Sequence, residues 1–176
     1  NLAFLSQLNA AGFTPQDLPV LHLTLEEEEI QQIGAAATGH WVASSYFQTI
    51  EAAENLAFVM AFKTVYGNER TVSASTAAGY SALYLWKALS EAARSTDAQA
   101  LQRVAASRAV QYPTPWGEQQ IEAATQQAAL VMRIGVVSDD GLIQQVSASS
   151  APLPPDPFLT QYPWAAGVQE QLGETP

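Results

Sequence analysis

The spacing of hydrophobic positions predicts helices over much of the chain. In four segments, apolar side chains recur at every third or fourth position, which is the pattern of a helix that buries one face. Gly12 and Gly67 follow two of these segments at the position where helices commonly end. The four predicted helices comprise residues 2–11, 53–66, 77–93 and 98–106.

Shorter apolar runs between the helices predict strands. Residues 18–25 form a mainly apolar run, and residues 41–50 are rich in aromatic and β-branched side chains. Residues 129–137 form a further strand, and the turn residues Asp139–Gly141 lead into a hairpin partner at 142–146. Because helices alternate with strands along the chain, the pattern predicts an α/β fold.

The stretch Gly39–Ile50 is the part of the sequence most typical of a ligand site. It begins as a strand, continues with the hydroxyls of Ser44 and Ser45 beside aromatic residues, and leads into a helical pattern from about Glu51. In open α/β sheets, ligands bind in the crevice outside the carboxyl ends of the strands. We therefore expect a ligand crevice at this stretch.

Three other segments have less regular patterns. The acidic run Glu26–Glu29 could suggest a cation site, but consecutive helical residues point in different directions, so we expect the solvated start of a short helix that ends at Gly34. Residues 107–128 are interrupted by prolines and by Gly117 and predict no clear element. From Ala151 the chain is rich in proline and aromatic residues, which predicts an extended strap on a surface.

Composition and charge narrow the range of partners. The 176 residues suffice for one domain with a sizeable core. The formal net charge is −10, and basic residues are scarce, so we expect no nucleic acid partner and no anionic membrane surface. The absence of cysteine excludes disulfides and thiolate metal sites and fits an oxidising compartment.

The ends of the sequence and its longest apolar runs give two further expectations. No run approaches the roughly 20 apolar residues of a membrane span, and no signal peptide pattern is present. The chain starts without Met on residues typical of a helix interior, so we expect a processed chain or a fragment.

Motifs of catalysis and metal binding are missing from the sequence. Neither His22 nor His40 has a second His or a Cys at helical spacing, so we expect a core or edge histidine and a surface or hydrogen-bonding histidine respectively. There is no Gly-x-Ser-x-Gly, no phosphate-binding loop and no Gly-x-Gly-x-x-Gly. We therefore expect no metal, no cofactor and no enzymatic activity, with an α/β enzyme domain as the weakest of the alternatives.

A series of short pieces occurs in one order across nearly the whole chain. These pieces are Thr14–Val20, Glu27–Ile30, Ile33–Gly34, Gly39–His40, Tyr46–Phe47, Ile50, Glu54–Asn55, Phe58–Val59, Phe62–Lys63, Tyr66–Gly67, Ala77–Tyr80, Tyr84–Trp86, Arg133–Gly135, Asp140–Gly141 and Pro155–Phe158. The series resembles the carboxyl-terminal half of type I periplasmic substrate-binding proteins. Within that family it is most similar to the urea- and short-chain-amide-binding subgroup, which includes an amide-sensing regulator.

The resemblance implies two Rossmann-like α/β lobes joined by hinge strands, with the ligand in the cleft between them. On this basis residues 1–38 belong to the second lobe and residues 39–128 mostly to the first lobe after a hinge crossing. Residues 129–150 form a hairpin near the hinge or second lobe, and residues 151–176 form an extended tail strap. The amino-terminal half of the same protein would supply the remaining parts of both lobes.

The resemblance also implies where a ligand is bound. The expected ligand-binding residues have hydroxyls or aromatic rings, which suit a small planar polar molecule. They are Ser44, Ser45, Tyr46, Thr76 and Tyr80. Relatives often have an acidic residue shortly before the position of Tyr80, where this chain has Ser75–Ala77. This departure removes a carboxylate that could accept the N–H groups of urea, so it argues against urea itself and leaves a related small amide, an amino acid or another polar ligand open.

Two functions follow from the resemblance. The first is that of an extracytoplasmic, periplasmic solute-binding protein, which captures urea, a short-chain amide or a similar small polar solute and delivers it to the membrane permease of an ABC transporter. The second is that of a ligand-binding sensory domain of the same fold, in which closure of the lobes changes the state of a signalling partner. Neither function is enzymatic.

Overall fold

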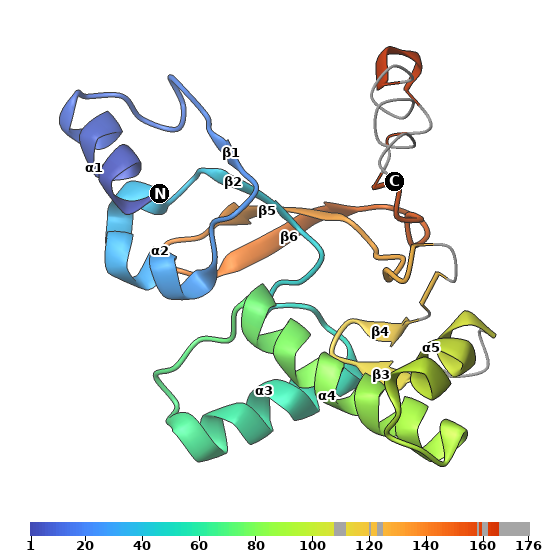
Figure 1. The fold of residues 1–176 in the computed structure, drawn as a ribbon. Helices are drawn as coiled ribbons and strands as arrows, with labels where there is room; N and C mark the ends of the chain where they lie inside the picture. The colour runs from blue at the N-terminus through green and yellow to red at the C-terminus, as the bar shows by residue number, and fades with distance from the viewer. Residues whose placement is uncertain (108–111, 120, 123–124, 158, 160–161, 166–176) are drawn as a thin grey trace.

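A mixed sheet is the central element of the computed structural model, which describes residues 1–107, 112–119, 121–122, 125–157, 159 and 162–165. Its strand order is β1 (Leu21–His22), β2 (Trp41–Ser44), β5 (Arg133–Val137) and β6 (Ile143–Ala148). β1 and β2 are parallel, whereas β5 is antiparallel to both β2 and β6. The α/β class and the predicted hairpin at the carboxyl-terminal side are thereby confirmed (Figure 1).

The first hydrophobic core lies between this sheet and the helices beside it. α1 (Leu2–Ala10), α2 (Glu27–Ile33) and the short 3₁₀ helix η1 (Gly34–Ala37) provide the helical side. The buried members of this core are Leu5, Leu25, Ile30, Ala37, Val42, Phe47, Val137 and Ile143. These apolar side chains hold the hairpin and the amino-terminal helices to the same central strand.

The helices α3 (Ala53–Tyr66), α4 (Ala74–Ala93) and α5 (Ala98–Ala106) form a separate group in Figure 1. A second, smaller core lies between α3 and the start of α4. Its buried residues are Tyr46, Phe58, Val72 and Ala77. Ile50 packs against both cores, so the segment after β2 joins the two parts of the molecule.

A side-chain contact also links the two parts. Glu26 caps α2, and its Oε1 accepts hydrogen bonds from the backbone N–H and the hydroxyl of Ser75 at 3.1 Å and 2.7 Å. Ser75 lies in the first turn of α4, so this contact connects the starts of two helices that belong to different cores.

The helix predictions match the structure closely. α1, α3 and α5 lie where the hydrophobic spacing predicts them, and Asp97 accepts a hydrogen bond from the backbone N–H of Ala100 as the cap of α5. α4 begins at Ala74, three residues before the predicted start, because Ser73 caps it by accepting from the backbone N–H of Thr76 at 3.2 Å.

Two predictions at the amino-terminal side are wrong in part. The predicted strand at 18–25 is reduced to β1, and Leu23 has 74% of its surface exposed. β1 is an edge strand, and Pro19 has no backbone N–H to donate to a neighbouring strand. The acidic run does begin a helix, but Glu27 is buried instead of solvated because its side chain faces the segment after β2.

The structure contains a hairpin where the sequence predicts no element. β3 (Tyr112–Thr114) and β4 (Gly117–Gln119) pair as antiparallel strands. Gly117 has a φ of +108° in their turn, and the Thr114 hydroxyl donates to its carbonyl at 2.5 Å. Of the residues that obscure the pattern, Pro113 therefore lies within β3, Pro115 lies in the turn, and Gly117 begins β4.

The segment after β6 is mostly without regular structure where it is described. Leu153 forms an antiparallel bridge with Leu130, and a short 3₁₀ helix η2 comprises Pro163–Ala165. Residues 166–176 of the predicted strap lie outside the described residues. In the described part of the chain, no helix combines the length and the hydrophobicity that crossing a membrane requires.

Candidate functional site

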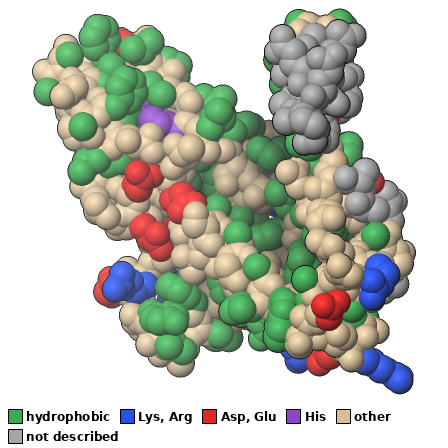
Figure 2. All heavy atoms as spheres, viewed as in Figure 1, with side chains coloured by type: hydrophobic (Ala, Val, Ile, Leu, Met, Phe, Trp, Pro, Cys, Tyr) green, Lys and Arg blue, Asp and Glu red, His purple; other side chains and the backbone are tan. Residues whose placement is uncertain are grey.

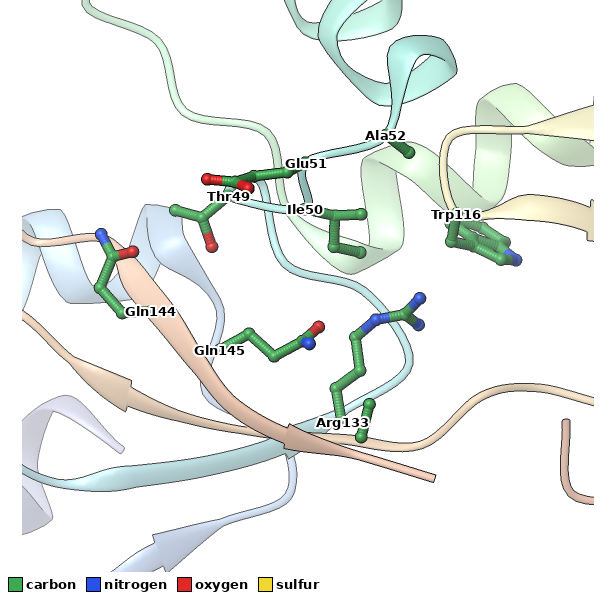
Figure 3. A pocket seen from close by; sticks show the side chains of 9 residues that line it. Thr49, Ile50, Glu51, Ala52, Trp116, Arg133, Gln144 and Gln145 are labelled. Atoms are coloured by element: carbon green, nitrogen blue, oxygen red, sulfur yellow. The ribbon is translucent and has the colours of Figure 1, made fainter. Parts of the chain in front are cut away.

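A pocket with a volume of about 470 Å³ lies where the two parts of the molecule meet (Figure 3). Three elements form its walls: the segment that leads from β2 to α3, the β5–β6 hairpin, and the turn between β3 and β4. The lining residues are Thr49, Ile50, Glu51, Ala52, Trp116, Arg133, Gln144, Gln145 and Ala148. The pocket thus begins at Thr49 and Ile50, the last two residues of the stretch in which the sequence predicts a ligand crevice.

Asn55 fixes the segment that forms one wall. Asn55 is completely buried at the start of α3, and its Nδ2 donates to the carbonyls of Gln48 and Ile50 at 2.9 Å and 2.8 Å. Its Oδ1 accepts a hydrogen bond from the Tyr46 hydroxyl at 2.8 Å. These three bonds define the path of the chain between the sheet and the helix.

Glu27 and Gln48 extend this buried polar network. Glu27 Oε1 accepts a hydrogen bond from the backbone N–H of Gln48 at 3.0 Å, and Gln48 Oε1 accepts from the backbone N–H of Val72 at 2.6 Å. Burial raises the pKa of the Glu27 carboxyl to about 7. The protonation state of a group in the network beneath the pocket wall therefore changes near neutral pH.

The β5–β6 hairpin brings two consecutive glutamines to the pocket. The strand pairing joins Gly135 to Gln145 and Ile134 to Ser147, so Val146 is left as a bulge residue. Gln144 and Gln145 both line the pocket, although neighbouring residues of a regular strand face opposite sides. An amide group has an N–H donor and a carbonyl acceptor, so each glutamine side chain can donate a hydrogen bond to a ligand or accept one from it.

Arg133 is the cation of the pocket. Its side chain is 7% exposed, and its Nη1 donates to the carbonyls of Ser45 and Val131 at 2.5 Å and 3.2 Å. Burial lowers the pKa of the guanidinium below its ordinary value. Among the residues that the structure describes, the ion pair found is that of Lys87 and Glu91, on the exposed face of α4, so Arg133 has no carboxylate partner there.

Glu51 and Trp116 lie at different sides of the pocket. In Figure 3 the Glu51 carboxylate points toward Thr49 and away from Arg133, whose guanidinium extends toward Trp116. The Trp116 ring packs edge-on against Tyr46 with 5.7 Å between ring centroids. The pocket therefore has a basic and aromatic end and an acidic and amide-rich end.

Three of the five predicted ligand-binding residues lie next to this pocket without lining it. The Ser44 hydroxyl accepts from the backbone N–H of Tyr46 at 3.4 Å, and Ser45 accepts from Arg133 through its carbonyl. Tyr46 is buried, its hydroxyl is bound to Asn55, and burial raises the pKa of that hydroxyl. In this structure the three residues support the pocket wall.

The other two predicted residues lie on α4. Thr76 belongs to the helix start, where its hydroxyl lies 3.0 Å from that of Ser73. Tyr80 is 37% exposed and packs between Phe58 and Tyr84, with ring centroids 4.5 Å and 4.7 Å away. It lines a second pocket of about 250 Å³ between α3 and α4, so the structure does not bring it together with Ser44, Ser45 and Tyr46.

Arg133, Trp116 and the two glutamines are pocket residues that the sequence pattern does not distinguish as ligand-binding. A signal for Arg133 was present, because it is the charged residue of the apolar run 129–137. Trp116 lies in the segment for which no element was predicted, and its role depends on the β3–β4 turn. The glutamines lie in β6, and the pairing register that places them beside the pocket has no reliable pattern in a single sequence.

The two histidines are buried near the edge of the sheet. Their rings meet edge-on with 6.0 Å between centroids, and His40 Nδ1 accepts a hydrogen bond from the backbone N–H of Val20 at 3.2 Å. Burial lowers the pKa of His22 and of His40. Within the described residues, no group of three His, Asp or Glu side chains could hold a metal ion.

Solved structures of solute-binding proteins share this fold. A protein of an ABC transporter from Rhodopseudomonas palustris in complex with 3,4-dihydroxybenzoic acid has a TM-score of 0.76 and 20% identity, over 89% of this chain and 43% of that chain. A leucine-, isoleucine-, valine-, threonine- and alanine-binding protein from Brucella ovis has a TM-score of 0.70 and 18% identity, over 88% and 42%. The chain spans about two fifths of the length of these proteins.

This chain is also similar in sequence to one named protein and to one family model. A protein named limonene hydroxylase from Geobacillus stearothermophilus is 30% identical over 136 residues, which are 77% of this chain and 24% of that protein. Because about three quarters of that protein has no counterpart here, its name assigns no reaction to this chain. The family model described as a periplasmic binding protein domain matches residues 1–163. The chain therefore belongs to the periplasmic binding protein domain family.

Proposed function

We propose that this chain is part of an extracytoplasmic solute-binding protein that delivers a small polar solute to the membrane permease of an ABC transporter. Membership of the periplasmic binding protein domain family supports the class of protein. Structural similarity to solute-binding proteins of ABC transporters supports the same class at the level of the fold. The chain acts by binding and releasing the solute, and not by converting it.

The observation that carries this proposal is the position of the polar pocket of about 470 Å³. Its walls come from the sheet and from the segment that leads into the helical group, so a solute in it contacts both parts of the molecule. Such a solute binds best when the two parts are in one relative arrangement, and binding therefore favours that arrangement. A transporter can recognise the protein that has closed around its solute.

The division into lobes is part of the proposal. Residues 1–38 belong to the second lobe, residues 39–128 mostly to the first lobe, and residues 129–150 to a hairpin near the hinge or second lobe. The remaining residues 151–176 are the tail strap. The amino-terminal half of the same protein supplies the rest of both lobes, and the exposed apolar side chains of α3 and α4 in Figure 2 provide a surface for it.

The solute class follows from the size and polarity of the pocket. Its volume is within the range of about 300–1,000 Å³ that is typical of small-molecule sites. Urea, short-chain amides and amino acids remain the candidates from the sequence. Solved neighbours bind benzoate, 3,4-dihydroxybenzoic acid and branched-chain amino acids according to their names, which adds aromatic acids to the candidates.

A thermal-shift scan of the natural full-length protein tests the proposal. The panel comprises urea, acetamide, leucine, alanine, benzoate and 4-hydroxybenzoate. A solute at a hundredfold excess over its Kd should raise the Tm by roughly 5 °C, because it binds the folded state only. If no member of the panel raises the Tm at any concentration, the proposed solute class is wrong.

A further inference from the structure

We propose that the pocket binds a solute through its carboxylate group and that the guanidinium of Arg133 is the group that recognises it. This inference rests on the proposed function, because it specifies the solute class of the same site. It selects carboxylic acids over the uncharged amides that the sequence resemblance suggests.

The hydrogen bonds of Arg133 leave donors available for a ligand. Both bonds that the guanidinium makes within the described residues start from Nη1 and end at the carbonyls of Ser45 and Val131. A guanidinium has five N–H donors in a fixed fork. The donors on Nη2 and Nε are therefore not used by the described part of the chain, and a carboxylate can accept two of them at once.

The charge of Arg133 is not balanced by the described part of the chain. The side chain is 93% buried, because 7% of its surface is exposed, and no described carboxylate is within ion-pair distance. A buried charge without a partner is costly, and neutral carbonyls satisfy its hydrogen bonds without neutralising it. A bound carboxylate would accept hydrogen bonds from the guanidinium and also neutralise its charge.

A role in folding alone does not account for this arrangement. Holding the Ser45 and Val131 carbonyls needs only Nη1, and neutral donors could do the same without the cost of a buried charge. An amide ligand is also a poorer match, because a guanidinium only donates and so offers nothing to the N–H groups of urea or acetamide.

The rest of the pocket suits an acid of the size of an amino acid or a benzoate. Trp116 and Ile50 provide apolar surface near the guanidinium, and the volume is about 470 Å³. Gln144 and Glu51 lie toward the other end, where they can accept hydrogen bonds from an ammonium or hydroxyl group. Glu51 is the acidic member of the lining and points away from Arg133, so it does not oppose a carboxylate there.

Calorimetric titration of the natural full-length protein with matched acids and amides tests the inference. Benzoate is compared with benzamide, and leucine with leucinamide, since each pair differs mainly in the carboxylate. We expect each bound acid to have a Kd about 10- to 100-fold lower than its amide, as charge-assisted hydrogen bonds normally give. Urea and acetamide are titrated as a second set.

Variants of the protein test whether Arg133 is the residue that gives the preference for the acid. Arg133→Gln should raise the Kd of the bound acid about 10- to 100-fold, and Arg133→Lys should restore part of the affinity. Arg103→Gln removes an exposed arginine of α5 and should leave the Kd unchanged. Circular dichroism shows whether each variant is folded, and if Arg133→Gln is not, the acid and amide comparison on the natural protein still decides.

Several results would overturn the inference. Equal affinity for acids and their amides would do so, as would an Arg133→Gln protein that binds the acid as tightly as the natural protein. Binding of urea or acetamide without binding of either acid would overturn the inference and leave the proposed function standing. If no solute binds, both the inference about Arg133 and the proposed function are wrong.

Discussion

Glu27 and Arg133 are two charged residues in buried positions, and their surroundings give them different properties. Glu27 receives one hydrogen bond from the backbone of Gln48 and belongs to the network under the pocket wall. Arg133 contacts the same segment through the carbonyl of Ser45. The sequence alone predicted a solvated Glu27, because an acidic run at a helix start is normally exposed, and it did not distinguish Glu27 from its three neighbours.

Glu27 makes the stability of the protein depend on pH. Its pKa is about 7 in the folded protein against an ordinary value of 4.5, so the folded protein retains a proton that the unfolded chain loses in this range. The free energy of unfolding should therefore fall as the pH rises from about 4.5 to about 7, and then level off. Glu27→Gln should remove this fall and raise the free energy of unfolding at pH 8 by up to about 3 kcal/mol.

Chemical denaturation of the full-length protein between pH 5 and pH 8 measures this effect. Glu28→Gln is the matched control, because Glu28 is exposed one position further along the same helix. An equal pH dependence in the natural protein and in Glu27→Gln would contradict the prediction.

At the scale of elements, the sequence predicted helices better than strands. α3 and α5 have the predicted bounds because each is long enough for its apolar spacing and end signals to agree. β1 and the β3–β4 hairpin were misjudged because each has only two or three residues per strand, and pairing with a distant partner decides such short strands. The pocket depends on these pairings, which explains why the sequence located its neighbourhood but not its lining.

The β5–β6 hairpin depends on close packing at Gly135. A Cβ atom at this position would lie 2.4 Å from Ile143 Cγ2 and 3.0 Å from a ring carbon of Phe47. Gly135→Ala should therefore lower the free energy of unfolding by about 1–3 kcal/mol, and it should weaken solute binding because the hairpin forms one pocket wall. Thermal unfolding of the full-length protein measures the first effect.

Gly79→Ala provides the matched control for this substitution. Gly79 lies within α4, and nothing lies within 4 Å of the position of an added Cβ. This substitution should raise the free energy of unfolding by roughly 0.5–1 kcal/mol, because alanine favours the helix. If both substitutions change the Tm in the same direction, close packing at Gly135 is not important.

At the scale of the whole molecule, exposed apolar side chains on α3 and α4 are the main feature. They include Leu56, Met60, Val65, Tyr66, Leu83, Tyr84 and Trp86. Surfaces of this kind are usually covered by another part of the protein. The resemblance implies that the amino-terminal half of the same protein supplies the rest of both lobes, and its contact with this surface stays a prediction.

A polypeptide of residues 1–176 on its own should therefore self-associate. Light scattering after size-exclusion chromatography measures this, and Leu56→Lys with Leu83→Lys should shift the sample toward monomer. Leu23→Lys is the control, because Leu23 is 74% exposed in the loop after β1, away from both helices. A cooperative monomer at all concentrations would contradict the prediction.

The order of the strands in the sheet has a consequence for the synthesis of the protein. β2 pairs on one side with β1, which precedes it closely, and on the other side with β5, which begins about 90 residues later. At about 5–20 residues per second, the ribosome needs roughly 5 to 20 seconds to add β5 and β6. Throughout that interval one edge of β2 and its apolar neighbours have no partner. A chaperone that holds the nascent chain should therefore bind at Trp41–Phe47 and be released once the hairpin docks.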